Sequence, residues 1–309
     1  MVKRKSVYEK AVISIIIVVI SAFAVIAFSL LNHTGTQSSS NQETQASNLL
    51  ISAENYFFQA SQHFDENDFV GTRTKLAVVN SNVTEAKNIL EASDIESSTK
   101  QYCLNVCDFY LNCSSMMDIL SYGFEHLNQA VARMNDNDWS GAVSKLLDAE
   151  DELNHVQSYF LLANEDLNSI DTTALPLEIK NSITETQTLF DEYKTLWPDL
   201  ANAVDACVPF ARGCNDLYEG LDYVQRYDWH AAKVSFEDSL PNISESKNKF
   251  DNLRYCNSSI VSSLASETFT KLVPIESALP HLIQGCEYAE AGDMSSATSE
   301  FDMATNILK

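Results

Sequence analysis

The sequence predicts an all-α protein, and three observations lead to this prediction. Gly and Pro are scarce, at 8 and 6 of 309 residues, which disfavours a turn-rich β fold. Apolar residues recur at alternating steps of three and four over long segments, the spacing that places them on one face of a helix. A short turn signature interrupts these segments four times. We therefore expect long helices that fold back on one another as hairpins.

The first helix that the sequence predicts is a membrane anchor. Residues 11–31 (AVISIIIVVISAFAVIAFSLL) contain no charge, and at about 1.5 Å per residue they can cross a hydrocarbon core of about 30 Å. A positive cluster precedes them in residues 1–10, and no further Lys or Arg occurs before Arg73. This asymmetry predicts that residues 1–10 are cytoplasmic and that the rest of the chain lies outside the cytoplasm at the cell membrane.

A cleaved signal peptide is the alternative to a retained anchor. Its apolar region should span about 7–15 residues and end at a small-x-small cleavage site. The apolar stretch here is longer, and Leu30-Leu31-Asn32 offers no such site. The sequence therefore favours a single-pass anchor that is retained.

Two further segments follow the anchor. Residues 32–48 are rich in Ser, Thr, Gln and Asn, a composition that predicts a flexible polar linker. Residues 49–309 form the predicted extracytoplasmic helical repeat domain.

The charge of the chain is strongly asymmetric. The net charge is −23, and because residues 1–10 carry +3 (four Lys or Arg against Glu9), the remainder carries −26. Such a surface repels nucleic acid and anionic lipid headgroups and favours cations or basic partners. A charged face that keeps the domain soluble also explains this composition without a cation store. We expect no nucleic-acid partner.

The turn signature begins with Asp. An aromatic residue or Met follows, then a small residue three positions later and a large apolar residue four positions beyond that. Asp is a good N-cap, and its charge suits the start of a helix, so the signature predicts the turn into the second helix of a hairpin. The four turns begin at Asp68, Asp138, Asp228 and Asp293.

The apolar spacing on either side of these turns predicts facing core layers. Before the second turn the seam runs back through Met134, Val131 and Leu127 to Cys103, and after it the seam runs from Trp139 to Ile170 in the mirrored register. The third hairpin repeats the pattern, from Val224 and Leu221 back to Leu189 and from Trp229 forward to Leu264. The fourth hairpin is shorter, and the first is the least regular because Glu54 interrupts it. The prediction is four long antiparallel α-hairpins that form an elongated bundle or solenoid.

The ends and kinks of the hairpins follow from the same pattern. We expect the reverse connections near Asp94–Ser98, Ile170–Pro176 and Ser263–Thr270. Pro inside a helix removes a hydrogen bond and clashes with the preceding turn, so the third hairpin should be kinked or broken at Pro198, Pro209 and Pro241.

At its turns the chain resembles the tetratricopeptide repeat. In that family an Asp or Asn and an aromatic residue precede a small residue and a large apolar one at these spacings, and a further small residue stands on the first helix. Here that residue lies eight positions before each Asp, at Ala60, Ala130, Gly220 and Gly285. The resemblance implies a helical-repeat scaffold for protein interactions. The turns lie 70, 90 and 65 residues apart rather than 34, so a bundle of long hairpins fits better than a concave solenoid groove.

The seven cysteines are interpreted mainly as core residues. Five of them fall on the predicted seams, where a free Cys acts as a small hydrophobe: Cys103, Cys113, Cys207, Cys214 and Cys286. None faces another Cys in the mirrored register, so a disulfide would have to cross between hairpins or involve the off-seam Cys107 and Cys256. Cys103 and Cys107 lie one helical turn apart, but no His or Cys at ligand spacing completes a metal set.

The remaining motifs support no catalytic or metal site. Glu152-x-x-His155 matches half of a di-iron motif, but there is no second copy and the seam leaves His155 on the outer side. Asp136–Gly141 matches the first half of an EF-hand loop, whose twelfth position is Leu147 instead of Glu. No GxSxG, P-loop, GxGxxG or HExxH motif occurs. We predict no catalytic residue and no cofactor, and therefore no enzyme.

Five Asn-x-Ser/Thr sequons are potential glycosylation sites on a domain outside the cytoplasm. Asn32 is close to the predicted membrane, and Asn257 falls on a predicted seam. The better candidates are Asn82, Asn112 and Asn242.

These observations predict a membrane-anchored extracytoplasmic scaffold that mediates protein–protein or cell-envelope interactions. Its partners are the membrane and an unknown protein or envelope polymer, and self-association into a homo-oligomer is compatible with this interpretation. The alternative is an extracytoplasmic ligand-sensing bundle. With only ten cytoplasmic residues, such a receptor would have to act through a partner.

Overall fold

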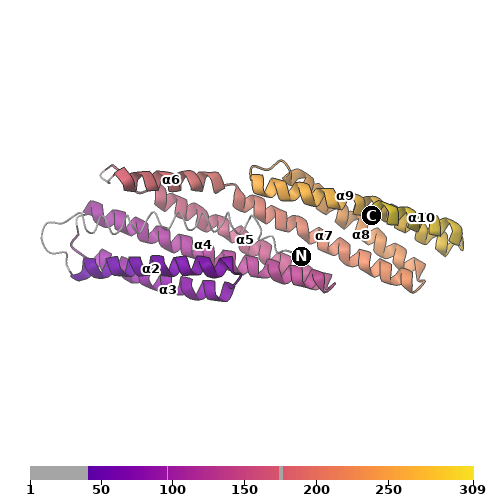
Figure 1. Ribbon diagram of the computed structural model, residues 1–309, viewed down its shortest axis with the longest axis horizontal. Helices are drawn as coiled ribbons and strands as arrows, with labels where there is room; N and C mark the ends of the chain where they lie inside the picture. Colours follow the sequence, from indigo (N-terminus) through magenta and orange to yellow (C-terminus); the bar gives the residue numbers. More distant parts are fainter. Residues whose placement is uncertain (1–40, 96, 174–176) are drawn as a thin grey trace. The chain divides into compact units, whose positions relative to one another are not determined.

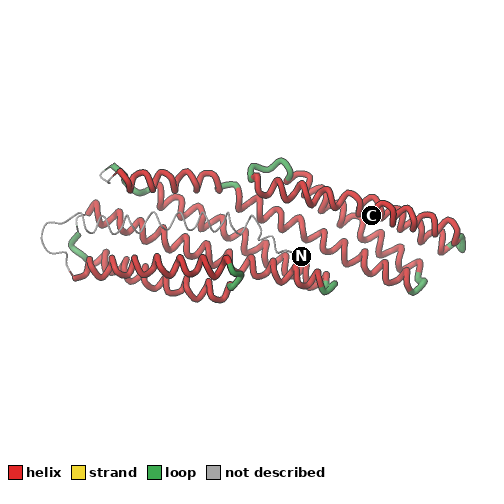
Figure 2. The backbone as a smooth tube through the Cα atoms, viewed as in Figure 1, coloured by secondary structure: helices red, strands yellow, loops and turns green. Residues whose placement is uncertain are grey.

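The computed structural model describes residues 41–95, 97–173 and 177–309, and every regular element in this part of the chain is an α-helix (Figures 1 and 2). The prediction of an all-α fold is confirmed. The helices are α2 (Asn41–Asp65), α3 (Phe69–Ala92), α4 (Ser97–Asn135), α5 (Trp139–Asn168), α6 (Leu177–Tyr193), α7 (Leu196–Gln225), α8 (Trp229–Leu253), α9 (Ser259–Glu290) and α10 (Met294–Leu308).

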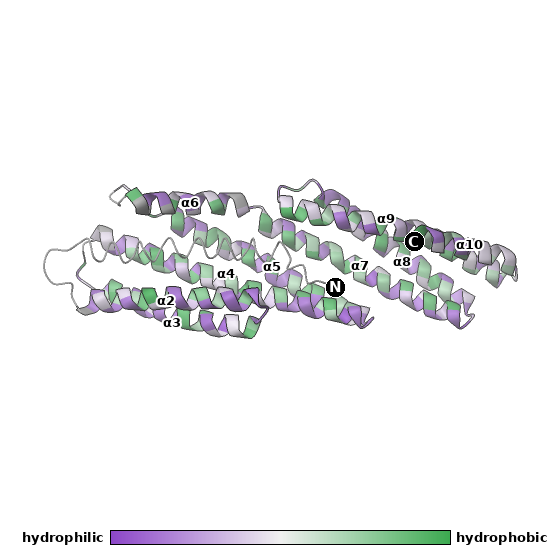
Figure 3. Ribbon diagram, in the orientation of Figure 1, coloured by the Kyte–Doolittle hydropathy of each residue, from purple (hydrophilic) through white to green (hydrophobic). Residues whose placement is uncertain are grey.

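The helices pack as antiparallel pairs joined at the four Asp turns. The pairs are α2 with α3, α4 with α5, α7 with α8 and α9 with α10, and α8 also packs against α9. In Figure 3 hydrophobic and hydrophilic residues alternate along each helix, as expected of helices that bury one stripe and expose another.

The chain divides into two compact units. In the described part, the first unit comprises residues up to Glu125 together with Glu152–Lys194, and so holds α2, α3, α6 and the adjoining portions of α4 and α5. The second unit comprises His126–Asp151 and Thr195–Lys309, which include the second turn and α7 to α10.

All four hairpin turns share one backbone conformation. The residue before each Asp has a positive φ, which is 61° at Asn67, 59° at Asn137, 61° at Tyr227 and 83° at Gly292. The N–H of this residue and the N–H of the Asp both donate to carbonyls of the preceding helix. At the first turn Asn67 donates to Phe64 (3.0 Å) and Asp68 donates to His63 (2.8 Å). This is the Schellman ending of a helix. The new helix therefore begins directly where the old one ends.

Each Asp then caps the second helix, as predicted. The carboxylate of Asp68 accepts from the Gly71 N–H at 2.9 Å and that of Asp138 from the Gly141 N–H at 2.9 Å. The carboxylate of Asp228 accepts from the Ala231 N–H at 3.2 Å, and Asp293 caps α10 in the same way. These bonds satisfy backbone donors that have no partner inside the helix.

A small residue next to each turn lets the two helices of the hairpin approach closely. A Cβ atom added to Gly220 would lie 2.4 Å from Cε1 of Phe236, and one added to Gly285 would lie 2.6 Å from Cε1 of Phe301. In the first two hairpins the same two positions hold buried Ala and Leu, in the pairs Ala60 with Leu76 and Ala130 with Leu146. Gly therefore faces the larger Phe, and Ala faces the smaller Leu.

This close approach corrects the predicted seams near the turns. Val131 and Leu221 are 56% and 39% exposed, although both were predicted to face the core. The buried residues are their predecessors, Ala130 and Gly220. The helices meet at the small residue, which shifts the line of contact by one position.

Farther from the turn the contacts of the third hairpin keep this offset of one position from the predicted register. Ser239 donates from Oγ to the Gly213 carbonyl at 2.7 Å, and Ser246 donates to the Ala206 carbonyl at 2.8 Å. Their predicted mates were Cys214 and Cys207, each one residue away. Both serines are buried, and these hydrogen bonds allow polar residues on the seam.

The third reverse connection lies nearer the turn than predicted. It spans residues 254–258 rather than Ser263–Thr270, and residues 260 and 264 belong to α9. Ser258 fixes this ending, because its hydroxyl accepts from the Val261 N–H at 3.3 Å and its own N–H donates to Asp199 at 3.0 Å. The Ser258 cap therefore starts α9 at a point where the apolar periodicity of the sequence still continues.

The prolines break the third hairpin at one of the three predicted places. The first arm divides into α6 and α7 at Lys194 and Thr195, and Pro198 is the third residue of α7. A missing N–H is tolerated in the first turn of a helix. Helices α7 and α8 continue through Pro209 and Pro241.

The first hairpin extends further than the sequence suggested. Helix α2 begins at Asn41 and includes residues 41–48, which were assigned to the polar linker. Ala46 and Leu50 are buried, and Gln45 donates to Glu85 of α3 at 3.4 Å, so pairing with α3 stabilises this segment. Ala53 and Leu50 continue the core past Glu54.

The predicted anchor, residues 11–31, lies outside the described residues. Among the helices that the structure describes, none combines the length and the apolar character needed to cross a bilayer.

The Gly–Phe layer of the third hairpin can be tested by substitution. We expect Gly220→Ala to reduce the free energy of unfolding by about 1–3 kcal/mol, because the added methyl group collides with the Phe236 ring. The double variant Gly220→Ala/Phe236→Leu recreates the Ala–Leu layer of the second hairpin. It should be more stable than the sum of the two single effects predicts, as measured by urea unfolding.

Gly123→Ala is the matched control for this experiment. Gly123 is a buried glycine of α4 whose added Cβ would lie 3.5 Å from Leu153 Cγ, an ordinary contact. This variant should be unchanged or more stable by up to about 1 kcal/mol, because Ala favours the helix. If Gly123→Ala and Gly220→Ala reduced the free energy of unfolding equally, the close approach of the helices at Gly220 would not be the cause of the loss.

The left-handed turn residue can be tested at Gly292, where an added Cβ has no neighbour within 4 Å. Gly292→Val should lower the free energy of unfolding by about 1–2 kcal/mol through backbone strain alone. Gly292→Asn, which places there the residue of the first two turns, should lose less than about 0.5 kcal/mol. Indistinguishable Val and Asn variants in urea titrations would rule out this account of the turn.

Candidate functional site

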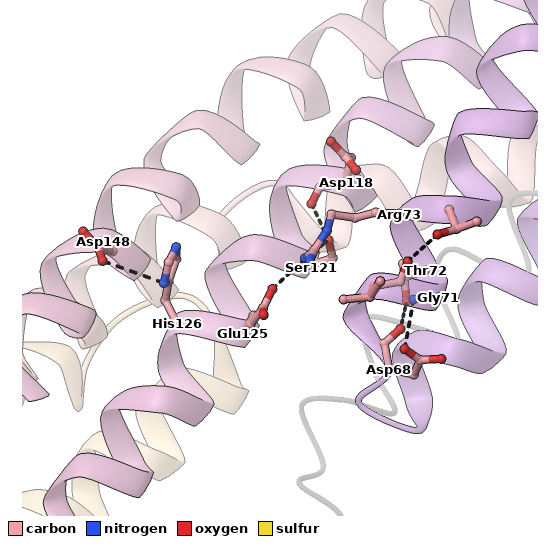
Figure 4. Close-up of polar contacts among 11 residues, drawn as sticks. Asp68, Gly71, Thr72, Arg73, Asp118, Ser121, Glu125, His126 and Asp148 are labelled. Atoms are coloured by element: carbon pink, nitrogen blue, oxygen red, sulfur yellow. Dashed lines mark hydrogen bonds and ion pairs between the residues drawn. The ribbon is translucent and has the colours of Figure 1, made fainter.

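The polar residues at the first turn form a compact network in the first unit (Figure 4). Asp68 places Oδ2 2.8 Å from Nδ1 of His63, while its other oxygen caps α3. Thr72 donates to the Asp68 carbonyl at 3.0 Å. The backbone hydrogen bond from Gly71, followed by the contact with His63, lowers the pKa of Asp68. Both oxygens of the Asp68 carboxylate are therefore engaged by groups of the turn.

Arg73 extends this network to α4. Its guanidinium lies 2.8 Å from Glu125 and 3.4 Å from the Ser121 hydroxyl (Figure 4). It also lies 4.1 Å from the centroid of the Tyr122 ring. The Arg73 side chain is only 17% exposed. Burial raises the pKa of the nearby Asp118, and the positive charge of Arg73 opposes that rise. The arrangement binds the first hairpin to α4, with the cation surrounded by protein groups.

The second turn uses its charged side chains in the same way, within the second unit. Asp138 pairs with Arg133 at 2.6 Å through the oxygen that does not cap α5. Asp148 accepts from Lys145 at 2.8 Å, and His126 lies 3.8 Å away (Figure 4). The half EF-hand therefore has its central carboxylate engaged by protein donors. Within the described ranges, no group of three or more His, Cys, Asp or Glu side chains is placed to hold a metal ion.

Aromatic rings at the first three turns lead to the next hairpin. In the first unit Phe69 packs edge-on against Phe64, whose ring lies 5.5 Å from that of Phe124 in α4. In the second unit Trp139 packs against Phe210 and Tyr218 of α7, at 6.3 and 5.4 Å. In the same unit Trp229 stacks on Phe301 of α10 at 6.1 Å. At the second and third turns the residue after the Asp therefore packs between hairpins, a role that the sequence did not reveal. At the first turn Phe64 makes this contact.

The seven cysteines are all free thiols in the structure. Cys107, predicted to lie off the seam, is fully buried, because α4 packs against α3 through Lys87 and Asp108 as well as against α5. Burial raises the pKa of the Cys103 and Cys107 thiols to about 12. Neutral thiols in these positions act as small apolar residues.

The three predicted glycosylation sites all lie inside helices and bridge to a second helix. Asn82 donates to Ser52 at 3.1 Å, Asn112 donates to Asp166 at 2.7 Å and Asn242 donates to Asp216 at 3.3 Å. Each amide nitrogen that would carry a glycan is thus already used to hold two helices together.

The other two motif residues occupy different environments. His155 is exposed, in agreement with its predicted place on the outer side of α5. Asn257 is also exposed, in the connection between α8 and α9, whereas the sequence placed it on a seam. The earlier ending of α8 is the reason for this difference.

Several carboxyl groups lie partly buried between helices. Burial raises the pKa of Glu54, Asp118, Asp166 and Asp216. Asp166 and Asp216 also accept from Asn112 and Asn242, which opposes the rise at each. Burial disfavours the charged form of these groups, whereas hydrogen bonds stabilise the charged form of Asp68, Asp138 and Asp293 at the turns.

Comparisons with known proteins give no relative on which a function could rest. No family model, no curated protein and no solved structure matches the chain.

The two sets of carboxyl groups predict an acidic optimum of stability. A group whose pKa is raised on folding binds its proton more readily in the folded state, so the free energy of unfolding should rise as the pH falls from 7 towards 5. Below about pH 4 Asp68, Asp138 and Asp293, whose pKa is lowered on folding, become protonated and their contribution is lost. Thermal melts followed by circular dichroism between pH 3 and 8 would measure both effects.

Asp166→Asn tests the partly buried carboxyl groups, because it removes one group whose pKa is raised by burial. It should reduce the gain in melting temperature between pH 7 and pH 5. Asp302→Asn, at an exposed position of α10, removes the same charge and should keep the full gain. A melting temperature that falls steadily from pH 7 to 5 would contradict this assignment.

Proposed function

We propose that the chain is a membrane-anchored helical scaffold that mediates protein–protein or cell-envelope contacts outside the cytoplasm. The observation that carries this proposal is the recurrence of one turn at four places, with rings leading from each of the first three turns to the next hairpin. Repeats that bury their apolar faces against neighbours build extended surfaces for partners. The resemblance of the turns to the tetratricopeptide repeat points to the same use.

The distribution of charge supports a basic partner. Many of the cations in the helical domain are engaged between helices, such as Arg73 with Glu125, Lys233 with Glu287 and Lys249 with Asp205. The excess of carboxylates therefore remains for the surface of a chain that carries −26 after residue 10. Such a surface attracts basic proteins or cationic polymers and repels nucleic acid.

The proposed topology follows from residues 1–31. The basic segment 1–10 favours a cytoplasmic N-terminus, and the apolar segment 11–31 favours a single span.

The topology is tested with protease added to intact cells. We expect the domain to be digested and a short fragment containing residues 1–31 to remain with the membrane. A cytoplasmic protein serves as the control for cell integrity. If the domain were fully protected in intact cells and were digested only after lysis, the extracytoplasmic location would be refuted.

The partner is tested with a carbodiimide, which joins a carboxylate directly to an amine without a spacer. On intact cells we expect adducts between the chain and a protein or an amine-bearing envelope polymer, and these should decrease in about 0.5 M salt because exposed charges are screened. A spacer-containing amine-to-amine reagent is the control for proximity alone. Recovery of a tightly bound small molecule with no adduct would favour the ligand-sensing alternative.

A further inference from the structure

The connection between α8 and α9 presents an exposed sequon, Asn257-Ser258-Ser259. Asn257 lies in a bend after the last turn of α8, and Ser259 is the first residue of α9. Both side chains are exposed, and neither makes a hydrogen bond to the described residues. Asn-x-Ser on a surface loop is the arrangement in which a glycan can be attached.

The backbone on either side of Asn257 is held in place. The Ser258 N–H donates to Asp199 of α7, and the Ser258 hydroxyl caps α9. The Ser262 hydroxyl donates to the Arg254 carbonyl, which closes the connection from the other side. The middle residue of the sequon is therefore turned inward as a structural cap, while Asn257 and Ser259 remain on the surface.

The other described sequons differ in just these respects. Asn82, Asn112 and Asn242 lie within α3, α4 and α8, and their amide nitrogens donate to Ser52, Asp166 and Asp216 on paired helices. A glycan on any of these nitrogens would replace a donor between two helices. A glycan on Asn257 would displace nothing.

We infer that Asn257 is the site of N-linked glycosylation in the folded domain, an inference that rests on the proposed extracytoplasmic location. The donor is a lipid-linked oligosaccharide. The Asn257 amide nitrogen forms a bond to the anomeric carbon of the first sugar, and the bond from that carbon to the phosphate oxygen breaks. The lipid phosphate leaves with the electron pair, and the amide loses one proton.

The experiment uses the full chain purified from its own cells. Trypsin releases residues 255–271, a peptide between Arg254 and Lys271 that contains Asn257 as its one sequon. Mass spectrometry should find this peptide mainly with the added mass of an oligosaccharide. Peptides that contain Asn82, Asn112 and Asn242 should be unmodified.

Matched substitutions separate the sequon from the fold. Asn257→Gln and Ser259→Ala should both remove the glycan, whereas Ser259→Thr keeps the sequon and should retain it. Asn82→Gln and Asn242→Gln should leave the glycan unchanged. All variants should keep the wild-type helical circular dichroism spectrum.

Two results would overturn the inference, namely an unmodified 255–271 peptide, or a glycan that persists in Asn257→Gln at one of the helical sequons. Protease added to intact cells then separates this failure from that of the proposed function. If the chain is unmodified but its domain is digested, only the glycosylation inference fails. If the chain is unmodified and its domain is protected, the proposed extracytoplasmic location fails as well.

Discussion

The fold depends on the close approach of two helices beside each Asp turn. At this layer a Gly or Ala of the first helix faces the position of a Phe or Leu of the second, and Gly220 with Phe236 is the tightest example. Such an approach requires the second helix to start at one fixed place. The turn provides it, because a left-handed residue ends one helix and the next residue, Asp, caps the other. Local backbone geometry thereby sets the register of the whole hairpin.

The hairpins are joined by side chains that reach from one hairpin to the next. Arg73 reaches from α3 to Glu125 and Tyr122, and Trp139 reaches from α5 to the rings of α7. The cations of this acidic domain are used in the same manner between α8 and α9, where Lys233 pairs with Glu287 and Lys247 with Glu276. Basic residues therefore serve to hold acidic helices together, and the unpaired negative charge is left for solvent or a partner.

This division of roles connects the fold to the proposed function. A scaffold outside the cytoplasm needs surfaces that remain soluble and specific while its repeats stay packed. The carboxylates supply the charge, the buried thiols and rings supply the packing, and the exposed sequon of the α8–α9 connection is the proposed site for a glycan. Partly buried groups such as Asp166 make the packing sensitive to pH, since their protonation removes charge from between helices.

The sequence by itself determined the helices, the four caps and the antiparallel pairing. These features depend on neighbouring residues, through hydrogen bonds over three positions and apolar spacing along one stripe. It also contained the signal for the left-handed position at Asn67, Asn137 and Gly292, but Tyr227 at the third turn obscured it. Only the tertiary structure decided which helix faces are buried between hairpins. For that reason Cys107 proved to be core, Val131 and Leu221 proved to be exposed, and Asn257 moved from a predicted seam to the surface. The physical cause is that burial depends on the distance between helices and on where each one stops, and small residues and a single serine cap decide both.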